Sequence, residues 1–120
     1  PLEKDYDFNT GVTTLRVDAA GLGNPLFCAG RVGGAATATS SIGQVGYTVS
    51  RPSGQSTGVY YIQFDSPAAT NDYVVSLAQI GSGNIKIWDY TQPTANGFHV
   101  VTYNQSWGVA NYSFHFSVVV

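Results

Sequence analysis

The sequence predicts an all-β protein, an antiparallel β-sandwich built from short strands. Gly, Ser, Thr, Asn, Val and Tyr dominate the composition, while good helix formers are few and Met is missing from the 120 residues. No segment shows the 3.6-residue apolar period of an amphipathic helix. Runs rich in β-branched and aromatic residues recur along the chain, and turn-forming residues separate them. These three observations favour a sandwich or barrel over a helical fold.

Eight runs have the composition of strands. In chain order they are 12–17, 26–32, 45–50, 58–64, 73–80, 84–90, 97–103 and 112–120. The turns are marked by Arg51-Pro52-Ser53-Gly54, Ser66-Pro67, Gly81-Ser82-Gly83-Asn84 and Ala95-Asn96-Gly97. Residues 33–44 are small and polar, and they are expected to form a loop or a sparse edge strand.

The first 25 residues differ from the rest of the chain. They contain four of the seven acidic residues, Glu3, Asp5, Asp7 and Asp18, and only one strand-like run. We expect 1–25 to be a connector or the end of a fibre stalk, and 26–120 to form one β-sandwich domain. Because the chain begins at Pro1 without a Met, we also expect it to be a fragment of a longer protein.

Charge is scarce in this sequence. Charged residues make up 10% of the chain, against roughly 25% in a typical soluble domain. The shortage predicts that part of the surface is covered in an oligomer. The five basic residues are scattered, and no apolar run approaches the roughly 20 residues that cross a bilayer. We therefore expect neither a nucleic-acid partner nor membrane insertion.

Side chains point alternately to the two faces of a sheet along a strand, so the sequence predicts which residues of the last strands face the core. One side of the last strand is predicted to lie in the core, and it carries Tyr112, Phe114, Phe116, Val118 and Val120. The other side of that strand carries His115, and the second side of 97–103 carries His99. These second sides are neither charged nor fully apolar, which suits packing between subunits. We expect the His99 and His115 faces to form part of a homotrimer interface.

The stretch from 45 to 80 resembles the C-terminal domain of phage and viral tail fibres. The resemblance depends on Gly58-Val59-Tyr60, Ser66-Pro67, Tyr73-Val74-Val75 and Gly97-Phe98-His99-Val100, with Phe27 and Arg31-Val32 resembling the opening strand. It covers about 26–120. The last half is also similar to the H-type lectin pattern, a six-stranded trimeric sandwich that binds amino sugars. Gly58-Val59-Tyr60-Tyr61-Ile62 gives a weaker likeness to the complement-type globular head, which is also a trimeric sandwich. These resemblances imply a compact antiparallel sandwich trimerised along a fibre axis.

The acidic residues do not suggest an enzyme. In the expected domain they are Asp65, Asp72 and Asp89, far apart in sequence and outside any catalytic motif. Asp65 and Asp72 flank one turn, where capping is the common role. The single Cys28 is expected to be a buried structural thiol. We predict no catalytic residues and no cofactor.

His99 and His115 are weak candidates for a metal site. If 97–103 and 112–120 formed a hairpin, the two imidazoles could lie opposite each other on one face. Three copies around a threefold axis could then bind a divalent ion. The alternative is a pair of semi-buried histidines hydrogen-bonded to the backbone or to Ser117.

Two segments have the composition of a sugar-binding site. Sugar rings stack on aromatic side chains, and their hydroxyls bind amides and carboxylates. Trp107, Asn104 and Gln105 lie in an expected hairpin tip, and Trp88, Asp89 and Tyr90 lie where another strand ends. Core or interface packing is the alternative for both tryptophans, and more so for Trp88.

The sequence therefore predicts a receptor-binding tip of a viral or phage tail fibre that adheres to host cell-surface glycans. The protein would be part of the virion and would act outside the cell. Two alternatives stay open: a structural trimerisation domain that ends a fibre, and a secreted H-type-like lectin.

Overall fold

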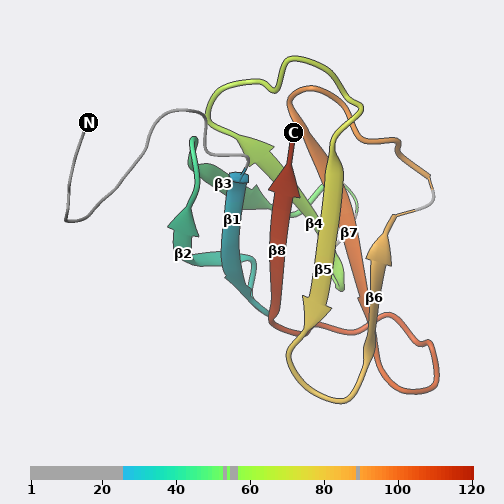
Figure 1. Cartoon of the computed structure of the whole chain (residues 1–120). Helices are drawn as coiled ribbons and strands as arrows, with labels where there is room; N and C mark the ends of the chain where they lie inside the picture. Colours follow the sequence, from blue (N-terminus) through green and yellow to red (C-terminus); the bar gives the residue numbers. More distant parts are fainter. Residues whose placement is uncertain (1–25, 53, 55–56, 89) are drawn as a thin grey trace, which may run out of the picture.

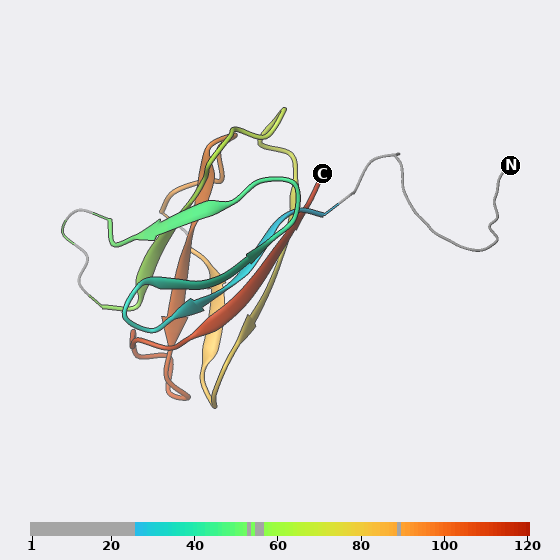
Figure 2. The same ribbon diagram turned by 90° about the vertical axis from the view of Figure 1, so that its left-hand side faces the viewer.

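Two antiparallel four-stranded sheets form a β-sandwich in the computed structural model, which describes residues 26–52, 54, 57–88 and 90–120 (Figure 1). One sheet has the order β2-β1-β8-β5 and the other β3-β4-β7-β6. The strands are β1 (Leu26–Gly33), β2 (Thr37–Ile42), β3 (Tyr47–Ser50), β4 (Val59–Phe64), β5 (Val74–Gln79), β6 (Asn84–Ile87), β7 (Gly97–Tyr103) and β8 (Phe114–Val119). Figure 2 shows the two sheets packed against each other. The predicted all-β sandwich is confirmed.

The strand boundaries follow the sequence prediction closely, with one difference. The segment 84–90 is a strand only as far as Ile87. Residues 37–42 form β2, which pairs with β1 at the edge of its sheet and has all six residues exposed. The sparse edge strand expected in this region is therefore present. The strand and connector predicted within 1–25 lie outside the described residues.

The last two strands do not form the expected hairpin. β7 pairs with β4 and β6, whereas β8 lies in the other sheet between β1 and β5. The ten residues between them are long enough to cross from one sheet to the other. Alternation gives each strand an inward face but does not say which sheet the strand joins. The prediction that His99 and His115 share one face is therefore wrong.

Aromatic side chains from both sheets fill the interior. The ring of Phe98 on β7 is fully buried and lies 5.7 Å from Phe116 on β8 and 6.0 Å from Phe64 on β4. Tyr60 and Phe114 make another edge contact between the sheets, with centroids 5.1 Å apart. These contacts have the tilted and edge-to-face geometry that aromatic pairs prefer.

Tyr47 joins the two sheets at β1 and β3. Its hydroxyl donates to the carbonyls of Arg31 and Ser40, at 3.0 and 2.8 Å. A Cβ at Gly30 would come within 2.5 Å of the Tyr47 ring, so only glycine lets the ring pass beneath β1.

Two predicted core residues lie outside the core. Phe114, Phe116 and Val118 are buried as the alternation predicted, but Tyr112 is only partly buried and Val120 is 61% exposed. β8 ends at Val119, so Val120 lies beyond the last pair that the neighbouring strands cover.

Candidate functional site

The outer side of the β3-β4-β7-β6 sheet carries an unusual number of aromatic side chains. Because successive residues alternate in direction, Phe98 and Val100 of β7 point into the core while His99 and Tyr103 point outward. The same outer side carries Tyr61, Lys86 and Trp88 from the neighbouring strands, together with Tyr90 and Trp107 from the adjoining loops. We call this surface the aromatic face.

A tight turn at 104–108 forms one end of the aromatic face. The Asn104 N–H donates to the Gly108 carbonyl at 2.8 Å, and the Trp107 N–H donates to the Asn104 carbonyl at 3.1 Å. The side-chain Oδ1 of Asn104 accepts from the N–H groups of Ser106 and Gly108, both at 2.9 Å. Four hydrogen bonds within five residues give this turn a defined backbone. In Figure 1 it is the loop that follows β7 at the lower end of the sandwich.

Trp107 is held in a conformation that tryptophan rarely adopts. Its φ is 65°, in the left-handed region, where an L-residue loses roughly 1–2 kcal/mol relative to the right-handed form. Its side chain is nevertheless 60% exposed, and its main aromatic contact is Tyr103, with centroids 5.2 Å apart. Core packing therefore does not explain the indole. Backbone strain of this kind is concentrated at functional sites.

The residues predicted beside Trp107 have different positions. Asn104 is partly buried, and its amide oxygen is already used by the backbone of the turn, so this side chain fixes the turn that presents Trp107. Gln105 is exposed in the same turn. The ligand-binding roles assigned to both residues stay predictions.

A row of four stacked or tilted rings occupies the other end of the aromatic face. Tyr61 on β4 stacks on His99 of β7, with centroids 4.6 Å apart and planes 27° apart. Trp88 lies 5.9 Å from His99, and Tyr90 contacts Trp88 at 5.6 Å. Tyr90 is 85% exposed, whereas the other three rings are partly buried. The third residue predicted in this segment, Asp89, lies outside the described residues.

Backbone pairing holds this row in register. Tyr61 pairs with His99 across β4 and β7, and the Trp88 N–H donates to the His99 carbonyl at 3.0 Å. The three side chains therefore form one line across the sheet. Sequence reasoning missed Tyr61 as a site residue. Its outward position followed from alternation, but its neighbours depended on the strand order.

His99 is kept neutral by its surroundings. Burial lowers the pKa of its imidazole below the usual value near 6.5, because the charged form loses hydration. Its Nδ1 atom is buried and has no hydrogen-bond partner among the described residues. The ring thus acts mainly as a stacking surface between Tyr61 and Trp88.

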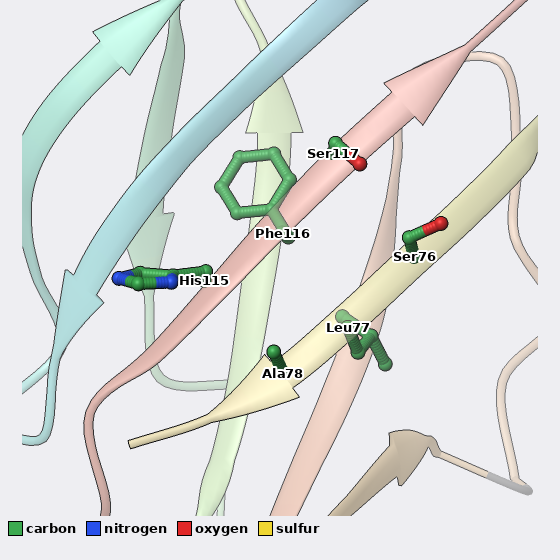
Figure 3. Close-up of a pocket in the computed structure, with 6 residues that line it drawn as sticks. All are labelled: Ser76, Leu77, Ala78, His115, Phe116 and Ser117. Carbon is green, nitrogen blue, oxygen red and sulfur yellow. The ribbon is translucent and has the colours of Figure 1, made fainter.

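The outer side of the β2-β1-β8-β5 sheet is different in character. It holds a hollow of about 180 Å³ along β5 and β8, lined by Ser76, Leu77, Ala78, His115, Phe116 and Ser117 (Figure 3). Figure 3 shows His115 extending from β8 toward β1, where it pairs with Arg31. The outward positions here are occupied mostly by small side chains.

The metal site suggested for His99 and His115 does not agree with the strand order. It required His99 and His115 on one hairpin, but they lie on strands of different sheets and face opposite sides of the sandwich. Among the residues that the structure describes, no group of three or more His, Cys, Asp or Glu side chains could hold a metal ion.

Cys28 is a buried structural thiol, as predicted. It is fully buried, and burial together with the nearby Asp65 carboxylate raises its pKa to about 11. The thiol is therefore protonated at neutral pH and is a poor nucleophile.

Comparison of the chain with models of known families, with curated proteins and with solved structures finds no match. In the described part of the chain, no helix is long and apolar enough to cross a membrane. The fold and site thus define a class only: an antiparallel β-sandwich with an aromatic outer face.

The neutral state of His99 leads to a pH-dependent stability. Because its pKa is lower in the folded chain than in the unfolded chain, stability is complete above about pH 6.5 and falls as the pH drops toward the folded pKa. The variant His99→Phe keeps a ring in the row but cannot be protonated. We expect its free energy of unfolding to decrease less between about pH 7 and about pH 5 than that of the parent chain. Denaturant titrations at several pH values measure this difference.

Tyr61→Phe is the matched control, because it preserves both the imidazole and the stacked ring. It should retain the pH dependence of the parent. If His99→Phe lost as much stability on acidification as the parent, the burial of His99 would not be coupled to folding.

Proposed function

We propose that this chain is a glycan-binding module, the receptor-binding tip of a viral or phage tail fibre that attaches to host cell-surface glycans. The observation that carries the proposal is the exposed Trp107, presented on a hydrogen-bonded turn at a backbone angle that favours glycine. The tail-fibre assignment is supported by the resemblance of residues 26–120 to such domains. The virion is the proposed location, and attachment takes place outside the cell.

The chemistry around Trp107 suits a sugar. The apolar C–H side of a pyranose stacks on an indole, and the 60% exposed ring leaves a surface open for this contact. Sugar hydroxyls lose hydration on binding and need hydrogen-bond partners. The exposed amide of Gln105, two residues away, can supply one. Asn104 supports the site by holding the turn.

A purely structural role does not account for Trp107. A trimerisation domain needs covered surface, and an exposed ring on a strained turn adds nothing to its core. Glycine at this position would relieve the backbone strain. The strain is understandable if the indole contacts a ligand.

The alternative role as a trimerisation domain has its own supporting observation, and it can coexist with glycan binding. Along β1, β5 and β8 the outward residues are small or apolar apart from His115 and one full charge, Arg31. They include Ala29, Arg31, Val74, Ser76, Ala78, His115, Ser117 and Val119. Ile42 and Val120 add exposed apolar surface at the same sheet. A sheet surface with so little charge is suited to contact between subunits.

We therefore propose a homotrimer that uses the outer side of the β2-β1-β8-β5 sheet, on which His115 lies. The His99 surface is on the opposite side of the sandwich, and in this arrangement it is available to the ligand. Three copies of a weak sugar site would bind a glycan-coated cell with useful avidity. A secreted lectin would use the same site but would not form part of a fibre.

Replacement of Trp107 tests the binding site. We expect Trp107→Ala to abolish or strongly weaken glycan attachment while the oligomer stays intact, because the change removes an exposed ring and no core contact. Binding to a glycan array, with the mass measured by light scattering, gives both quantities. Val109→Ala, at a 50% exposed position just beyond the turn, is the matched control and should bind like the parent.

If Trp107→Ala bound glycans as well as the parent chain does, the turn would not be the binding site. Failure of the parent chain itself to bind any glycan would instead favour the structural role.

The oligomeric state is tested separately. We expect light scattering to give three times the chain mass at micromolar concentration. Ser76→Arg, on the outer side of β5, should lower this mass because it puts a charge into the proposed contact. Thr48→Arg, at an exposed position on β3 of the other sheet, should leave it unchanged. A monomer mass for the parent chain would contradict the trimer.

A further inference from the structure

We infer that the row of Tyr61, His99 and Trp88 is a second sugar subsite on the aromatic face, so that the ligand is a neutral oligosaccharide of several units. The inference rests on the proposed glycan-binding function and deepens it. It adds Tyr61 and His99, which the sequence did not identify as sugar-binding residues.

The three rings form a platform rather than separate exposed side chains. Tyr61 and His99 are stacked at 4.6 Å, and Trp88 tilts by 46° against His99 at 5.9 Å. Each ring is partly buried by its neighbours, so little side-chain freedom remains to be lost on binding. Tyr90, which is 85% exposed and 5.6 Å from Trp88, extends the row toward solvent.

The platform and the Trp107 turn lie on the same side of the sheet. His99 and Tyr103 are both outward residues of β7, and Tyr103 contacts Trp107. They are four positions apart along the strand, which corresponds to roughly 14 Å. A single pyranose is about the size of a tyrosine ring and cannot contact both ends. A ligand that uses both sites must therefore be a chain of sugars.

Val101 is the outward residue of β7 between His99 and Tyr103, and it is only 1% exposed because neighbouring side chains cover it. Its neighbours across the sheet are Val59 on β4 and Lys86 on β6. The Lys86 ammonium lies 5.9 Å from the centre of the Tyr103 ring.

The low charge of this surface indicates which kind of ligand it suits. Lys86 is the one fully charged residue among the described outward positions of its four strands. These positions are Thr48, Ser50, Val59, Tyr61, Gln63, Asn84, Lys86, His99, Val101 and Tyr103. A nearly uncharged row of aromatic rings complements the C–H faces of a neutral glycan. It offers few ion pairs to a charged protein partner.

The test compares ligands of increasing length. The probes are linear homo-oligosaccharides of N-acetylglucosamine, glucose, galactose and mannose, from the single sugar to the hexamer, titrated calorimetrically into the whole chain. We expect affinity to rise with length. Trp88→Ala should weaken the affinity for the longest oligosaccharide that binds by about tenfold, which is the effect of losing one aromatic contact. The affinity for the shortest sugar that binds should not change. Trp107→Ala should weaken both.

Gln63→Ala is the matched control, because Gln63 is exposed on the same outer side of β4 but outside the row. Gln63→Ala should bind every oligosaccharide with the affinity of the parent chain. His99→Phe should retain most of the length dependence, because it keeps a ring between Tyr61 and Trp88.

Each outcome separates the two proposals. If Trp107→Ala lost binding but affinity did not depend on length, and Trp88→Ala bound like the parent, the second subsite would be wrong and the first would stand. If Trp88→Ala changed the mass of the oligomer, the row would belong to a subunit contact and the inference would be overturned. Binding of no probe to the parent chain would contradict glycan binding and the subsite with it.

Discussion

The aromatic packing between the two sheets is the constraint on which the rest of the structure depends. Phe98 from one sheet contacts Phe116 from the other, and Tyr47 and Tyr60 bring their hydroxyls to backbone carbonyls of the opposite sheet. Each strand must turn one of its two faces inward to build this core. The other face of each sheet lies outside this core, and it is the face that a ligand or another subunit can reach.

The two outer surfaces divide the remaining tasks between them. One carries rings in rows and a strained Trp107, and the other carries small side chains with exposed Ile42 and Val74. The first surface has the chemistry that we propose for a ligand site, and the second has the low charge that suits the proposed subunit contact. If both proposals hold, this separation would let one small chain bind a glycan and form a trimer without the same residues having to do both.

Much of the fold could be predicted from the sequence because alternation and turn residues act locally. The strand at 97–103 and the buried Phe114, Phe116 and Val118 are found as predicted. Pairing is a long-range property, and the supposed hairpin between 97–103 and 112–120 was wrong for that reason. The predicted site was recognisable in part: composition identified Trp107 and Trp88. Tyr61 was missed, since the β4–β7 register places it against His99, which in turn contacts Trp88.

The central claim is that the ligand lies on the aromatic face. The chain has only two tryptophans, and both indoles belong to this surface, so their side-chain N–H signals in a nuclear magnetic resonance spectrum report on it directly. Titration with a bound oligosaccharide should shift both indole signals together with the backbone signals of β7. Shifts confined to β5 and β8, with both indole signals unchanged, would place the ligand on the opposite side of the sandwich and contradict the account.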